Sequence, residues 1–209
     1  MKWKQVSQYE NPPPGSHIAR CISIIDLGTQ THQFQGRDPW SSRDVRIGFE
    51  LPLEEMTGCY NHEMKGKPFG ISITLKQSLH QSSKMRGLLE SWRGRKFTKE
   101  ELSGFDPKKL LGCPCRLTLV ENGDYTNIEA ISPLGRGDVI PKQINPSLYF
   151  SLDPEQFDAE LFGRLSQRMQ EKIQASPEFQ AILAGEDGGQ ADADEAAAQQ
   201  QTVDDDCPF

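Results

Sequence analysis

Val45-Arg46-Ile47-Gly48-Phe49-Glu50-Leu51 is the stretch of sequence that decides the fold. Its apolar residues alternate with Arg, Gly and Glu, which is the two-residue period of a β-strand with one buried face. The same period recurs in Phe69-Gly70-Ile71-Ser72-Ile73-Thr74-Leu75-Lys76. Arg46 and Lys76 then lie on the exposed sides of their strands, and the two stretches together indicate a mainly β domain.

An earlier strand is predicted for residues 17–27, which are rich in Ile and lie between Pro12-Pro13-Pro14-Gly15 and Gly28. The polar segment 29–43 that follows is too long for a plain hairpin turn, which favours a functional loop. Gln33-Phe34-Gln35-Gly36-Arg37-Asp38-Pro39-Trp40 lies within it.

Helical periodicity replaces alternation after residue 81. Either Ser82 or Ser83 can cap a helix that ends at Arg93-Gly94-Arg95, and Thr98-Lys99-Glu100-Glu101 has the pattern of a capping box for a second, short helix. The stripe at i, i+3, i+4 and i+7 of the first helix consists of Met85, Leu88, Leu89 and Trp92.

Two further strands follow the helical block. Alternation over 115–119 is followed by Asn122-Gly123, a strong hairpin-turn signal, and by a return strand at 125–131. Five strands with a helical block between the third and the fourth is the order of an OB-fold, a partly open barrel that binds oligonucleotides. We therefore expect residues 1–150 to form a five-stranded OB-like barrel.

The C-terminal part divides into two predicted regions. Residues 151–184 are expected to form an amphipathic helical extension, with one helix over 154–173. Its apolar face must bury against the chain's own barrel or against a second copy, which would give a homodimer. Residues 185–209 contain eight acidic and no basic residues, and their low apolar content predicts a disordered acidic tail.

The formal net charge of −7 averages two unlike segments. Residues 1–150 carry 20 Lys and Arg against 16 Asp and Glu, a net charge of +4, whereas residues 151–209 carry 3 against 14, a net charge of −11. The basic charge therefore lies on the part expected to fold, as a nucleic-acid binder requires.

Several classes of protein are disfavoured. No apolar run approaches the roughly 18 residues that would cross a bilayer, so we expect a soluble cytoplasmic protein that does not bind membranes. An enzyme such as a nuclease needs clustered carboxylates or a nucleophile beside a base, and neither pattern is present, so none of the residues is assigned as catalytic. Cys59, His62, Cys113 and Cys115 lack convincing zinc spacing, so no metal or other cofactor is expected.

The final residues, Asp204-Asp205-Asp206-Cys207-Pro208-Phe209, resemble the acidic tip of bacterial SSB proteins, in which Asp residues precede a terminal Pro-Phe. Cys207 stands where that tip usually has a bulkier aliphatic residue. The resemblance implies that these six residues bind replication or recombination proteins, with Phe209 entering an apolar pocket.

The body resembles a family of phage-encoded proteins described as single-stranded DNA-binding. The likeness covers most of residues 17–150, and it implies an OB-fold that holds single strands without strong sequence preference. It departs from bacterial SSB over this whole region. The matching runs are Leu88-Leu89-Glu90-Ser91-Trp92-Arg93-Gly94-Arg95-Lys96-Phe97-Thr98, Glu100-Glu101-Leu102, Phe105-Asp106, Leu111-Gly112-Cys113-Pro114-Cys115, Tyr125-Thr126-Asn127-Ile128 and Ile131-Ser132-Pro133-Leu134.

Gripping single strands without reading their sequence needs aromatic faces for the bases and cations for the phosphates. The aromatics expected outside the core faces are Phe34, Trp40, Tyr60 and Tyr125. The expected phosphate partners are Arg37, Arg43, Arg46, Lys76, Arg93, Arg95 and Lys96. Trp92 belongs to the apolar helix stripe and is expected in the core.

The sequence thus predicts a non-enzymatic protein that coats single-stranded DNA in phage replication or recombination and recruits partners through its C-terminal tip. The alternative is a replisome or recombinase adaptor whose barrel binds protein instead of DNA. Binding of an oligonucleotide distinguishes the two. The tail could also compete with DNA for the basic face of the barrel.

Overall fold

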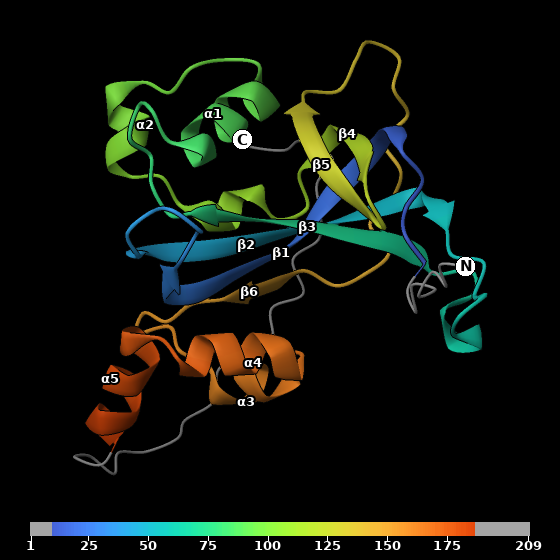
Figure 1. The fold of residues 1–209 in the computed structure, drawn as a ribbon. Helices are drawn as coiled ribbons and strands as arrows, with labels where there is room; N and C mark the ends of the chain where they lie inside the picture. The colour runs from blue at the N-terminus through green and yellow to red at the C-terminus, as the bar shows by residue number, and fades with distance from the viewer. Residues whose placement is uncertain (1–9, 187–209) are drawn as a thin grey trace.

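The structure is a computed structural model that describes residues 10–186, and the predicted tail from residue 187 onward, with its tip, lies outside these residues. The main elements are a sheet and two groups of helices on its opposite sides (Figure 1). In chain order they are β1 (Gly15–His32), β2 (Trp40–Glu55), the 3-10 helix η1 (His62–Met64), β3 (Pro68–Lys76), α1 (Lys84–Arg93), α2 (Lys99–Ser103), the 3-10 helix η2 (Pro107–Leu110), β4 (Pro114–Asn122), β5 (Tyr125–Ser132), β6 (Leu148–Phe150), α3 (Ala159–Arg164), α4 (Gln167–Gln174) and α5 (Pro177–Glu186).

The sheet has the strand order β3-β2-β1-β4-β5, with antiparallel neighbours, and β6 pairs parallel to β1. The mainly β class is confirmed. Three-residue β6 is an addition to the five predicted strands, because so short a segment shows no alternation. No hydrogen-bond ladder joins β3 to β5 within the described residues, so the sheet is open at this point.

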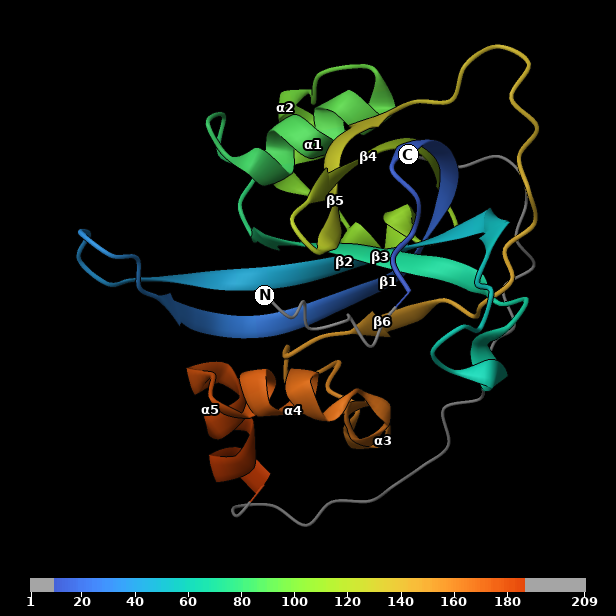
Figure 2. The same ribbon diagram turned by 45° about the vertical axis from the view of Figure 1, so that its right-hand side comes forward.

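Strands β1 and β2 are longer than predicted, and the turn between them projects beyond the other strands (Figure 2). The expected loop over 29–43 is wrong at both ends, because Thr29 to His32 pair with Trp40 to Arg43 and only residues 33–39 connect the strands. This part of the hairpin is polar and lacks apolar alternation. Its side chains pair across the strands, as between the hydroxyls of Thr31 and Ser41, which lie 3.3 Å apart.

The main core lies between the sheet and the helical block of α1 and α2. The hydroxyl of Ser83 caps α1 by accepting from the Arg86 N–H, and Gly94 ends the helix with φ 68°. Trp92 is 3% exposed, and its indole Nε1 donates to the Pro114 carbonyl at 2.9 Å. The prediction of Trp92 as a core residue is confirmed, as is the capping box of α2.

A second core lies on the opposite side of the sheet, where α3, α4 and α5 cover β1 and β6 (Figure 2). The single helix predicted over 154–173 is wrong, because the helical structure begins only at Ala159 and the chain turns at Leu165–Ser166; a second turn at Ala175–Ser176 separates α4 from α5. Ser166 is the N-cap of α4, and the Ser176 hydroxyl accepts from the Phe179 N–H at the start of α5. The apolar residues of this extension nevertheless share one core with Ile25 and Leu27 of the same chain. Of the two expected ways to bury them, packing on the chain's own sheet is the one observed.

No helix within residues 10–186 combines the length and apolar character needed to cross a membrane.

Candidate nucleic-acid interface

The alternation of β2 divides its side chains between two faces of the sheet. Val45 and Ile47 point into the main core, and Arg43 shares their side of the strand. Trp40 and Arg46 point to the opposite, outward side. The β1–β2 register shifts twice, but β2 is uninterrupted from Trp40 to Glu50 because the extra residues belong to β1.

Three aromatic rings stack where the outward side reaches the end of the β1–β2 hairpin. The ring centroids of His32 and Trp40 are 5.4 Å apart with an interplanar angle of 24°, and those of Phe34 and Trp40 are 6.2 Å apart at 19°. Phe34 is 69% exposed and Trp40 is 41% exposed. Stacked rings open to solvent offer faces on which bases can continue the stack.

His32 was not predicted to take part in the site. It is the cross-strand partner of Trp40, a relationship hidden by the wrong loop prediction. Its Nε2 lies 3.1 Å from Oδ2 of Asp44, and the Ser42 hydroxyl donates to Oδ1 of Asp44 at 2.9 Å. These contacts hold the imidazole ring against the indole.

Basic and small side chains lie next to the aromatic stack, along the outward side of β2 and β3. Lys76 is exposed and pairs in register with Asp44, while Thr74 pairs with Arg46. Arg46 is half-buried, and burial, with a smaller contribution from nearby Arg168, lowers its pKa. The other outward residues near Arg46, on the side away from the hairpin, are small. They are Gly48, which is buried, and Gly70 and Ser72 of β3.

Arg37 belongs to the same region, since it lies in the exposed turn between Phe34 and Trp40. Its backbone N–H donates to the Phe34 carbonyl at 3.1 Å, which closes the turn. Five of the predicted residues therefore lie along one side of the β1–β2 hairpin, its turn and the adjoining end of β3. They are Phe34, Arg37, Trp40, Arg46 and Lys76.

Three other predicted arginines lie away from this face and have carboxylate partners. Arg43 pairs with Asp26 on the opposite side of β2. Arg93 and Arg95 both pair with Glu101 of α2, and the Arg93 guanidinium lies 4.4 Å from the centroid of the Phe97 ring. Lys96 is exposed in the same helical block.

The remaining predicted aromatics lie at the other end of β2. Tyr60 is 50% exposed and Tyr125 is 67% exposed, so both are outside the core as predicted. The N-terminal segment connects their loops: the Glu10 carboxylate accepts from Thr57 N–H at 2.8 Å, and the Asn11 amide donates to the Asp124 carbonyl at 2.7 Å. This end is about 50 Å from Trp40 measured along β2, which has 16 residues.

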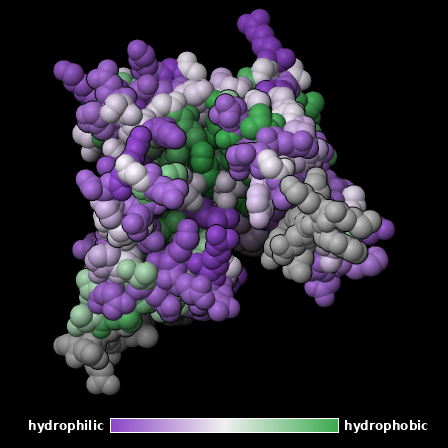
Figure 3. Space-filling model, viewed as in Figure 1, coloured by the Kyte–Doolittle hydropathy of each residue, from purple (hydrophilic) through white to green (hydrophobic). Residues whose placement is uncertain are grey.

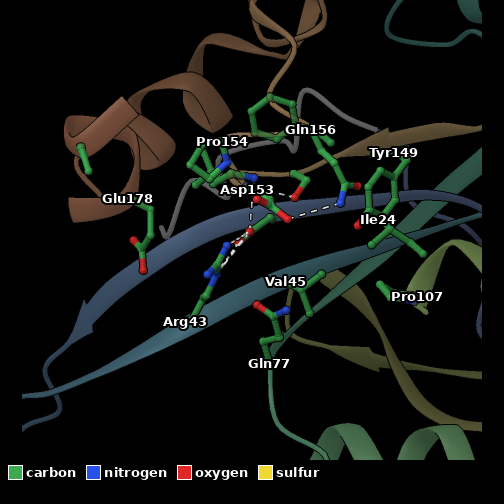
Figure 4. A pocket seen from close by; sticks show the side chains of 15 residues that line it. Ile24, Arg43, Val45, Gln77, Pro107, Tyr149, Asp153, Pro154, Gln156 and Glu178 are labelled. Atoms are coloured by element: carbon green, nitrogen blue, oxygen red, sulfur yellow. Dashed lines mark hydrogen bonds and ion pairs between the residues drawn. The ribbon is translucent and has the colours of Figure 1, made fainter. Parts of the chain in front are cut away.

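A cavity of about 480 Å³ opens on the Arg43 side of the hairpin (Figure 4). Asp26, Asp153 and Glu178 line it together with Arg43. The hydrogen bond to Asp26 raises the pKa of Arg43, and the charges of Glu178 and Asp153 add to this effect. Carboxylates outnumber the cation, so this cavity is poorly suited to a phosphate.

The chain was compared with models of protein families, with curated proteins and with solved structures, and none of them matches it. Within residues 10–186, no group of three or more His, Cys, Asp or Glu side chains is placed to hold a metal ion. The predicted partner-binding tip, Asp204 to Phe209, lies outside the described residues.

Proposed function

We propose that this chain is a non-enzymatic, single-stranded DNA-binding protein built on an OB-like sheet. The strand order β3-β2-β1-β4-β5, with helices between β3 and β4, supports this proposal because it is the order expected for an OB-fold whose β3–β5 seam is open. OB-folds bind strands across strands 2 and 3 and beside the first hairpin loop, which here carries Phe34 and Arg37.

The exposed stack of His32, Trp40 and Phe34 is the observation that carries the proposal. Each base stacked on an aromatic ring can contribute about 1–3 kcal/mol, and stacking is tolerant of sequence because every base has a π-face. Arg46 and Lys76 on the same side of the sheet supply charge for phosphates. Aromatic rings next to cations on one open face are what a strand-coating protein needs.

Fluorescence anisotropy of a labelled oligo-dT of about 30 nucleotides, titrated across a salt series, tests this function. Tight binding, weaker binding to a duplex of the same length, and a log-log salt slope of about 0.7 per phosphate contact are expected. Absence of binding at low salt, for the full chain and for a chain ending at Ala184, would reject it.

The second part of the proposal concerns the tip, and it rests on the sequence resemblance. Asp204 to Phe209 would recruit replication or recombination proteins in the cytoplasm of a bacterial host, with salt-sensitive attraction from the three Asp residues. Removal of residues 204–209 should abolish binding to a protein that recognises SSB tips. A synthetic SSB-tip peptide should compete with the full chain for that protein.

An adaptor that binds protein remains the second candidate, and one observation favours it. The connection between β5 and β6 exposes apolar side chains, with Val139 80% exposed and Ile144 58% exposed. Exposed apolar residues that gather on one surface commonly mark protein contacts. If oligonucleotides do not bind while SSB-tip receptors do, the adaptor is the better description.

A further inference from the structure

Helix α4 lies against the outward side of the sheet, next to the strand that carries Arg46. Met169 and Ile173, one helical turn apart, pack in the second core with Ile25 of β1. Ile25 is the register partner of Arg46. Because register partners share a face of an antiparallel pair, Arg46 extends toward the same layer as α4.

Arg168 and Lys172 form a basic flank on α4. They are four residues apart, so they project from the same side of the helix. Both are exposed, and hydrophilic side chains cover α4 in the view of Figure 3. Arg168 adjoins Met169, which packs in the core that contains Ile25, so this flank lies near β2. The charge of Arg168 accordingly adds to the effect of burial in lowering the pKa of Arg46.

Arg46 and Arg168 have no hydrogen-bond or ion-pair partner within residues 10–186, which distinguishes them from Arg43, Arg93 and Arg95. Half-buried Arg46 and exposed Arg168, two cations on adjoining layers, favour an anion bound between them. A phosphodiester suits the space, because each guanidinium presents a planar set of N–H donors that matches phosphate oxygens.

We propose that Arg46 of β2 and Arg168 of α4 together bind one phosphate of the bound strand, so that the C-terminal helical layer forms one wall of the DNA-binding groove. This inference rests on the proposed single-strand binding and adds a residue to it. Trp40 lies six residues before Arg46 on the same side of β2, about 20 Å away along the strand. One strand can therefore stack at the hairpin and place a phosphate beside α4.

The outward residues next to Arg46 are small, and Gly48 is buried beneath the Ser23 side chain while Gly70 of β3 is exposed. Gly48 follows Arg46 on the outward side, and a Cβ built on it would lie 2.2 Å from the Ser23 hydroxyl oxygen. Gly70 and Ser72 face it from β3. These small residues lie beyond Arg46 as seen from Trp40, so they allow a strand that passes Arg46 to continue close to β3.

The test compares Arg168→Gln with Arg164→Gln, a matched loss of one positive charge from an exposed arginine of α3. Binding of oligo-dT is measured by anisotropy across a salt series with the full chain. We expect Arg168→Gln to weaken binding by about tenfold and to lower the salt slope by about 0.7, which is one phosphate contact. Arg164→Gln should leave the slope unchanged.

The double variant shows whether the two arginines share one phosphate. Arg46→Gln alone should lower the slope by the same amount as Arg168→Gln, and the double variant should lose less affinity than the product of the two single losses. Losses that multiply, with a slope reduced twice, would mean two separate phosphates and would overturn the shared site.

Two outcomes separate failure of this inference from failure of the proposed function. If the wild type binds oligo-dT in a Trp40-dependent manner, but Arg168→Gln behaves like Arg164→Gln, the shared phosphate site is wrong and strand binding stands. If the wild type binds no oligonucleotide, both proposals fall. Thermal melts check folding, and Arg168→Gln should melt no lower than wild type at low salt because it removes a repulsion.

Discussion

The Nε of Arg43 lies 3.2 Å from Oδ2 of Asp26, on the side of β2 opposite to Trp40 and Arg46. Asp26 also accepts from the Gly28 backbone N–H at 3.0 Å, so its carboxylate organises the bend of β1. Arg43 therefore has a structural role. We expect Arg43→Gln to cost about 1–2 kcal/mol of unfolding free energy, a value reduced because the Arg43 side chain is 38% exposed.

The binding data should separate Arg43 from Arg46, which lie only three residues apart. Arg43→Gln should leave the affinity for oligo-dT and its salt slope near the wild-type values. Arg46→Gln should lower both the affinity and the magnitude of the salt slope. Chemical denaturation and anisotropy on the same protein samples measure the two effects. Equal losses of affinity for the two variants would contradict the assignment of opposite faces.

Trp40→Ala should weaken oligo-dT binding by about 1–3 kcal/mol, at least about fivefold, because it removes the central ring of the stack. Trp40→Phe should retain part of the affinity, since a smaller ring still stacks. Quenching of tryptophan fluorescence by the bound strand gives a second measurement. Quenching that persists unchanged in Trp40→Phe would place the bases elsewhere.

Glu101 should make part of the stability depend on pH. Hydrogen bonds from Arg95 and Arg93 and from the Thr98 N–H hold the pKa of this carboxyl far below its ordinary value of 4.5. A depressed folded-state pKa stabilises the fold above pH 4.5, and this contribution is lost as the pH falls toward the folded-state pKa. Thermal melts should therefore show Glu101→Gln less stable than wild type near pH 7, with the difference shrinking below pH 4.5.

Glu121→Gln is the matched control, since Glu121 is an exposed carboxylate of β4. Its melting temperature should follow that of the wild type throughout the pH series. A constant difference between Glu101→Gln and wild type from pH 7 to pH 3 would show that the ion pairs do not supply the effect.

Much of the fold could be predicted because several elements bury one regular face. Alternation placed the strands around Phe49 and Ile71, and the 3.6-residue period placed α1 with Trp92 in the core. The far half of the β1–β2 hairpin could not be predicted, since polar residues form it and only cross-strand pairing holds it. The helix over 154–173 was mispredicted because its apolar residues meet in space although the chain turns between them.

The sequence could predict those parts of the candidate site whose position follows from the alternation of a single strand. The alternation that places Val45 in the core already assigns Arg43 and Arg46 to opposite sides, although both were expected to contact phosphates. His32 depends on hairpin register, and Arg168 depends on how α4 packs against β1. Neither contact leaves a local pattern in the sequence.

A substitution at Gly28 should affect both the stability of the C-terminal helices α3 to α5 and the binding of DNA. It has φ +69°, and a Cβ built on it would lie 2.5 Å from the Ser176 side chain, where α5 begins. Next to it, the Glu178 carboxylate of α5 accepts from the Thr29 N–H at 2.8 Å and from its hydroxyl at 2.6 Å. Gly28→Ala therefore adds a steric clash to the cost of a left-handed alanine, and it should displace α5 with its neighbour α4 from β1.

Gly123→Ala isolates the backbone cost, because Gly123 has φ +65° and nothing within 4 Å of a built Cβ. That variant should lose about 1–2 kcal/mol of unfolding free energy and bind oligo-dT as the wild type does. Gly28→Ala should lose clearly more stability and, if α4 carries a phosphate contact, a measurable part of its affinity. Gly28 is buried and cannot contact bound DNA. Reduced affinity in the folded variant would therefore show that DNA binding depends on the packing of α4 and α5 against β1.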